Sequence, residues 1–130
     1  MSAQPVHHDG PIIPMPPLTR DALREAVKRL SLVNLPQFDL EAGRAFDQAS
    51  HTGSTAPLQI FLKRWGVFVA IERDPRRAAH LHEAERISQD GSAGEEAFHA
   101  AKAEINGILR EAEQEIEGLQ LLRASLMDPG

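Results

Sequence analysis

The longest periodic run in this 130-residue chain lies near its C-terminal end, and it places the strongest constraint on the fold. Apolar residues recur there every three or four positions, which predicts one helix over residues 93–127. The stripe consists of Phe98, Ala101, Ile105, Ile108, Leu109, Ala112, Ile116, Leu119, Leu122 and Leu126. A helix of about 33 residues is roughly 50 Å long, whereas a compact domain of this chain length is about 36 Å across. The helix must therefore extend beyond the domain or break, and Gly107 and Gly118 are its weakest points.

Four shorter helices are predicted before this run. The first begins after the N-cap residue Thr19, the second near Pro36, and the fourth spans residues 75–88. The third, residues 57–73, is apolar on nearly every side, which is typical of a buried helix. We expect it to lie at the centre, with another helix crossing closely at Gly66 because a glycine in a helix interior otherwise destabilises it.

These patterns predict an all-α protein in which about five helices surround the central hydrophobic helix. The expected domain covers residues 18–127, with a globular body at 18–90 and the long helix at 92–127. Ser92 and Glu95 have the spacing of a capping box at the start of that helix. The end of the long helix either packs against the first helix of the same chain or is left partly bare.

The N-terminal stretch, residues 1–17, holds five of the nine prolines in the chain. Proline removes backbone donors and favours extended geometry in the preceding residue, so this stretch is predicted to be a disordered arm. In the alternative interpretation, Ile12, Ile13 and Met15 lie along a groove of the domain.

Composition excludes several classes of protein. The absence of cysteine rules out disulfides, a thiol nucleophile and a cysteine-based zinc site. No apolar run reaches the ~18 residues of a membrane span, and the N-terminus has no secretory pattern. We therefore expect a cytoplasmic location and no membrane partner.

No motif indicates an enzyme or a metal site. His80 and His82 are two residues apart, so a helix would point them in different directions. The carboxylates of the long helix occupy alternate positions and are read as a solvated face. Nucleophile elbows and phosphate-binding loops are absent from the sequence. The prediction is a protein without catalytic residues, cofactor or metal.

Charge is divided unevenly along the chain. Residues 1–77 carry ten lysines and arginines against eight acids, a net charge of +2, whereas residues 78–130 carry four against eleven, a net charge of −7. An acidic, partly apolar helix suits a basic protein partner or a second copy of the chain. The residues predicted to bind this partner are Glu111, Glu115, Ile116, Leu119, Leu122 and Leu126.

A second hypothesis is a DNA-associated regulator that uses the basic face of the first helix and residues 73–77. Its phosphate-facing side chains would be Arg24, Lys28, Arg76 and Arg77. The overall net charge of −5 makes nucleic acid the less favoured partner.

Residues 57–75, with their Arg64-Trp65 and Arg73-Asp74-Pro75 marks, resemble a family together with the preceding Leu35-Pro36-Gln37-Phe38 and Ala45-Phe46. It consists of small, functionally uncharacterised, all-helical actinobacterial proteins, and the resemblance covers roughly residues 18–88. Some of its members look like antitoxins, which would imply a helical body whose C-terminal segment wraps a ribonuclease-type toxin. This chain departs from that pattern, because a long acidic helix follows residue 90. The resemblance supplies no catalytic residue.

Overall fold

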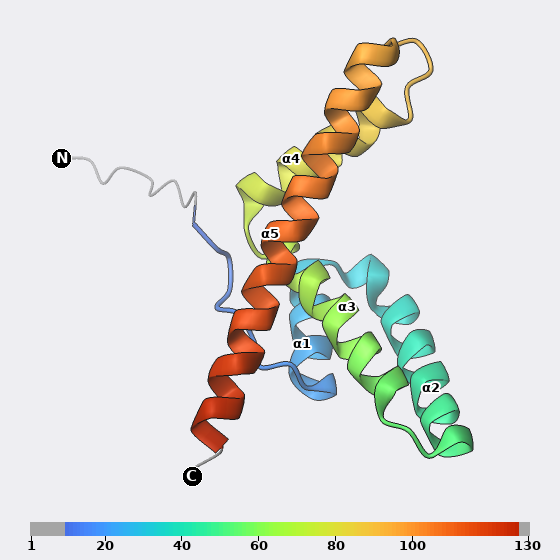
Figure 1. Ribbon diagram of the computed structural model, residues 1–130, viewed down its shortest axis with the longest axis vertical. Coiled ribbons are helices and arrows are strands. Elements are labelled where there is room, and N and C mark those ends of the chain that lie inside the picture. The colour runs from blue at the N-terminus through green and yellow to red at the C-terminus, as the bar shows by residue number, and fades with distance from the viewer. Residues whose placement is uncertain (1–9, 128–130) are drawn as a thin grey trace, which may run out of the picture.

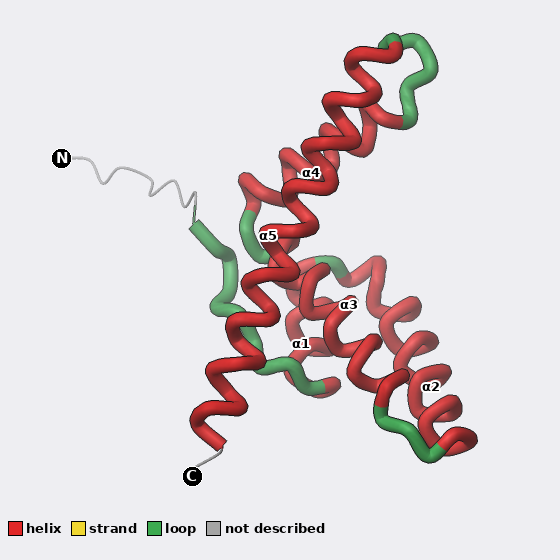
Figure 2. Tube along the Cα trace, in the orientation of Figure 1, coloured by secondary structure: helices red, strands yellow, loops and turns green. Residues whose placement is uncertain are grey.

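The computed structural model describes residues 10–127, apart from the side chains of the last few residues of the final helix. This part of the chain forms five α-helices and one short 3-10 helix, with no strand, so the predicted all-α fold is confirmed (Figures 1 and 2). The elements are α1 (Arg20–Leu30), η1 (Leu32–Asn34), α2 (Leu35–Thr52), α3 (Ala56–Glu72), α4 (Pro75–Ser88) and α5 (Glu95–Met127).

The helix α3 lies at the centre of the fold, as predicted, and packs against α1, α2, α4 and α5. Aromatic side chains of α3 and α2 pack together in the core. The ring centroid of Phe38 on α2 lies 5.0 Å from that of Phe61 and 5.1 Å from that of Trp65, both on α3. From α1, Leu23 and Val27 complete this cluster and are fully buried. Burial weakens toward the start of α3, where Ile60 is 67% exposed, because no helix covers that side of its first turns.

The predicted close crossing at Gly66 is present, and α5 provides it. A Cβ atom at Gly66 would lie 3.5 Å from Ile116 Cδ1 and 2.8 Å from Leu18 Cδ2. The missing side chain therefore lets α5 and the segment before α1 reach the α3 backbone. Among the described residues α5 contacts α3 and α4 and not α1, so for this part of the chain the alternative in which its end packs against the first helix is wrong.

The long helix α5 continues through Gly107 and Gly118 and extends beyond the body at both ends (Figure 1). Its N-terminal half runs antiparallel to α4, and the two form an arm that projects away from α1–α3. The arm is held by a seam of small and medium apolar residues, namely Ala78, Leu81, Ala84, Ala101 and Ile108. The predicted body, 18–90, thus differs from the structure, since α4 belongs to the arm.

The predicted capping box is wrong. The Ser92 hydroxyl donates a hydrogen bond to Asp90 Oδ1 at 2.7 Å, so it caps a turn and not α5. The helix begins instead after Gly94, whose φ of 92° is accessible to glycine and whose carbonyl accepts from the Phe98 N–H.

Residues 10–17 pack against the body as an extended segment. The Ile12 N–H donates to the carbonyl of Arg73 at 2.7 Å, and Arg73 Nη1 donates to the carbonyl of Ile13 at 3.2 Å. Ile13 is buried in the main core cluster. For this stretch the groove alternative is observed in part, because Ile13 is buried and Met15 packs on the core whereas Ile12 is 62% exposed. Residues 1–9 of the predicted disordered arm lie outside the described residues. Within residues 10–127, no helix combines the length and apolar character needed to cross a membrane.

Two helix-interior glycines give a matched test of the crossing. Gly43 has no atom within 4 Å of a built Cβ, so Gly43→Ala should raise the free energy of unfolding by about 1 kcal/mol through helix propensity. Gly66→Ala should gain clearly less, because its methyl group meets Leu18 and Leu18 must move. Urea denaturation of both variants measures the difference, and equal gains would contradict the close crossing.

Glu41 gives the body a pH-dependent contribution to stability. Burial raises the pKa of Glu41. Hydrogen bonds from Gln37 at 2.7 Å and from Trp65 Nε1 at 2.9 Å together lower the pKa by more than burial raises it, so the net pKa lies below the ordinary 4.5. The stability that this carboxylate supplies is present above its unfolded-state pKa and is lost as pH falls through the lowered folded-state pKa. Glu41→Gln should therefore destabilise the protein near pH 7 and approach the wild type at strongly acidic pH. Denaturation at a series of pH values measures the free energy of unfolding of both proteins, and a difference between them that does not change with pH would contradict this.

Candidate functional site

The apolar stripe of α5 leaves the body after Ile116. This side chain is fully buried at the crossing with α3, whereas Leu119 is 39% exposed and Leu122 is 58% exposed. Residues three apart on a helix are neighbours on its surface, so these three positions form one continuous stripe that slants around the helix. Its last part has lost the cover that α3 provides to Ile116. We call the exposed part, Leu119 and Leu122, the tail stripe.

The structure corrects part of the predicted partner surface. Ile116 was expected to face a partner, but it is a core residue because the crossing at Gly66 buries it. The side chain of Leu126 lies outside the described residues. Leu121 is 72% exposed and projects from the opposite side of α5, two positions from Leu119.

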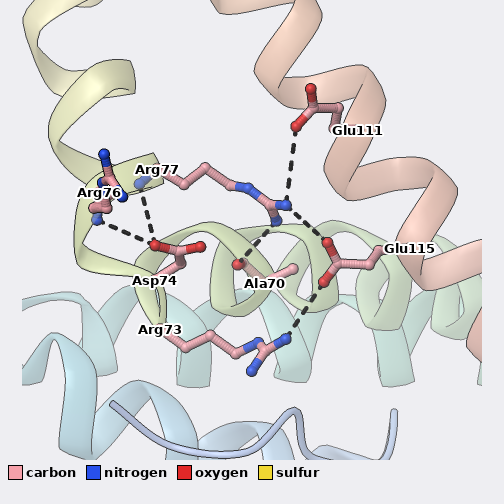
Figure 3. A network of polar contacts seen from close by, with 7 residues as sticks. All are labelled: Ala70, Arg73, Asp74, Arg76, Arg77, Glu111 and Glu115. Carbon is pink, nitrogen blue, oxygen red and sulfur yellow. Dashed lines mark hydrogen bonds and ion pairs between the residues drawn. The ribbon is translucent and has the colours of Figure 1, made fainter. Parts of the chain in front are cut away.

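Glu111 and Glu115 were also predicted to face a partner, and for Glu115 the structure differs, whereas the side chain of Glu111 is 70% exposed. Glu115 Oε2 lies 2.9 Å from Arg77 Nη2, and its other oxygen lies 3.5 Å from Arg73 Nη2 (Figure 3). Glu111 Oε1 is 3.9 Å from Arg77 Nη2. The end of α3 and the start of α4 face this stretch of α5, so the two acids bind arginines of the same chain. We call Arg73, Arg77 and Glu115 the arginine clamp.

Local structure at the turn between α3 and α4 positions the clamp. Asp74 caps α4 by accepting from the backbone N–H groups of Arg76 and Arg77, at 3.1 and 3.3 Å. The side chain of Arg77 then crosses toward α5 and also donates to the carbonyl of Ala70 at 3.3 Å, near the end of α3 (Figure 3). The clamp and its neighbours therefore join α3, α4 and α5, and Arg73 adds the N-terminal segment through Ile13.

The four arginine and lysine residues of the DNA hypothesis do not act together. Arg24 forms two hydrogen bonds of 2.8 and 2.9 Å with Asp39, which raise the pKa of Arg24 and lower that of Asp39. Arg77 belongs to the clamp. Lys28 and Arg76 are exposed and form no ion pair with any described residue. Acids of the same chain thus occupy two of the four predicted phosphate contacts.

Sequence reasoning missed two exposed apolar features. In the connection between α1 and α2, Leu32 is 63% exposed and Val33 is 85% exposed. In the arm, α4 and α5 enclose a shallow apolar hollow of about 340 Å³ that includes Ile87 and Ala100. The apolar pair within a predicted connection was a visible signal, whereas the hollow depends on how two helices pack.

The histidines and acids of the described residues do not gather into a metal-binding group. No group of three histidine, aspartate or glutamate side chains in residues 10–127 is placed to hold a metal ion. His80 faces the arm hollow, while His82 Nε2 lies 2.8 Å from Glu72 Oε2 in an exposed pair. The two histidines therefore have separate surroundings.

Comparison of the chain with protein-family models, with curated proteins and with solved structures finds no match in any of the three. Function is therefore inferred from the surfaces and contacts of the molecule.

The clamp predicts which acidic residues of α5 matter for stability. Glu115→Ala removes the carboxylate shared by Arg73 and Arg77, both about four-fifths buried, and should lower the free energy of unfolding by about 1–2 kcal/mol. Glu113→Ala, an exposed neighbour, should change it by less than about 0.5 kcal/mol. Urea denaturation of the two variants makes the comparison. Equal changes in the free energy of unfolding would show that the clamp contributes no more to stability than any other acid on α5.

Proposed function

We propose that this protein is a non-enzymatic interaction module that self-associates through the tail stripe of α5. The observation that carries the proposal is the change along one face of one helix, from a fully buried Ile116 to a half-exposed Leu122. The same stripe serves as core where α3 covers it and remains apolar where the described residues cover it only in part. Such a face is stabilised when another apolar surface removes it from water.

The second copy is favoured over a basic partner by the charges that remain on α5. Of the two acids expected to recognise a basic protein, Glu115 is held 2.9 Å from Arg77, and Glu111 lies 3.9 Å from the same arginine. The exposed side chains of the tail stripe are leucines. An apolar contact of this kind discriminates little by charge, and a like surface is its simplest complement.

The tail stripe also complements itself geometrically. When two copies of α5 pack antiparallel about a two-fold axis, Leu119 of one copy lies opposite Leu122 of the other, and the reverse contact follows by symmetry. The antiparallel arrangement also places opposite ends of the two helix dipoles side by side. Because α5 extends past the body at this end, the two bodies can stay apart while the helices meet (Figure 1).

Replacing both leucines with a charged residue should abolish the dimer. Light scattering coupled to size-exclusion chromatography should give the mass of two chains for the wild type and of one chain for Leu119→Asp/Leu122→Asp. Burial of each leucine contributes about 1.5–3 kcal/mol, so the dissociation constant should rise at least about a hundredfold.

The control is Leu121→Asp, which places the same charge on the same turns of α5, about 160° around the helix from Leu119 and about 100° from Leu122. This variant should remain a dimer, and circular dichroism should show equal helix content in all three proteins. A monomeric wild type, or a double variant that stays dimeric, refutes the proposal. If the double variant instead loses only a co-purified basic protein, the result would favour the antitoxin-like interpretation.

A further inference from the structure

The arm carries a second apolar surface, far from the tail stripe. Among the described elements, α4 packs only against α3 and α5, so beyond the body the arm consists of two helices with no third helix against them (Figure 1). The hollow between them is lined by Ala84, Ile87, Ala97, Ala100 and Ala101, and its lining is mainly apolar. We call this surface the arm groove.

The arm groove has the shape of a seat for a helix. A second hollow adjoins it on α5 and shares Ala100 and Glu104, and its floor continues over Ala103 and Gly107. From Ala97 to Gly107 the helix rises by about 15 Å, or three turns. Small side chains along this length allow the backbone of a packed helix to approach closely, since interaxial distance depends on the side chains at the contact.

The rim of the groove is acidic. Glu104 lies between the two hollows and forms no ion pair with a described residue, while Glu83 on the α4 side is 2.6 Å from Arg86. Residues 78–112 as a whole carry seven acids against three lysines and arginines. The groove thus combines an apolar floor with a negative border.

We infer that the arm groove binds a basic amphipathic helix of another protein, with small or medium apolar residues on its inner face. The floor would cover the apolar stripe of that helix, and Glu104 would pair with lysine or arginine at its border. A second copy of this chain fits poorly, because it would bring the acidic rims of two arms together. The tail stripe and the arm groove lie toward opposite ends of α5, so one molecule can use both surfaces at once (Figure 1).

The probe is a fluorescein-labelled helical peptide of about 20 residues, roughly 30 Å long, with leucine and alanine on one face and lysine on the other. Its acidic counterpart carries glutamate in place of lysine. Fluorescence anisotropy of the full chain should show saturable binding of the basic peptide that weakens with added salt. The acidic peptide should not bind.

Two variants and one matched control locate the site. Ala100→Trp fills the groove at an exposed position, and Glu104→Lys reverses the charge of its rim; each should weaken peptide binding by about tenfold or more. Glu113→Lys makes the same charge change on an exposed part of α5 outside the groove and should alter affinity by less than about twofold. Circular dichroism checks the fold, and Glu104→Lys decides the outcome if the tryptophan variant loses helix content.

Three results would overturn the inference. The first is a wild type that does not bind the basic peptide, and the second is equal weakening by Glu104→Lys and Glu113→Lys, which would reflect general charge attraction. The third is a fall in the molar mass of the peptide-free protein on Ala100→Trp, because it would show that a second copy occupies the groove. Loss of the dimer in the Leu119→Asp/Leu122→Asp variant has no bearing on this result, since that surface is separate.

Discussion

The contact between α5 and the backbone of α3 at Gly66 determines how the rest of the molecule is arranged. Because Ile116 and Leu18 fill the space that a side chain at Gly66 would take, α5 is held against the body near one point of its length. A straight helix of about 50 Å fixed in this way must extend beyond a smaller body on both sides. One extension pairs with α4 and becomes the arm, while the apolar stripe of the other becomes progressively more exposed beyond Ile116.

The crossing alone does not determine the orientation of α5 relative to α3 and α4, and the arginine clamp fixes that orientation. Glu115 lies one position before Ile116 and binds Arg77 of α4 and Arg73 at the end of α3. The backbone carbonyl of the same Arg73 accepts a hydrogen bond from the Ile12 N–H, and Arg73 Nη1 donates to the carbonyl of Ile13. Apolar packing thus sets where α5 crosses, and the clamp ties α3, α4 and the N-terminal segment to that crossing.

The helices were predictable because each depends on local signals. The periodicity of residues 57–73 predicted a central helix, and the unusual glycine at position 66 predicted a close crossing. Tertiary pairing was not predictable in the same way. Glu111 and Glu115 resemble solvent-facing acids in the sequence, since nothing local shows that Arg73 and Arg77 face them. The arm groove likewise depends on side chains of α4 and α5 that are far apart in the sequence, and the family resemblance remains a prediction.

The uneven charge of the chain takes on a different meaning once these contacts are known. The arginines at the junction of α3 and α4 bind Glu115 in the middle of α5, and Arg86 pairs with Glu83 on the arm, so Glu104 is the acid at the border of the groove that forms no ion pair with a described residue. The apolar excess lies at the other end, at Leu119 and Leu122. A single helix therefore contributes to two surfaces of different chemistry, an apolar groove with Glu104 at its border and a stripe of exposed leucines. The body between them serves to hold that helix at a fixed crossing.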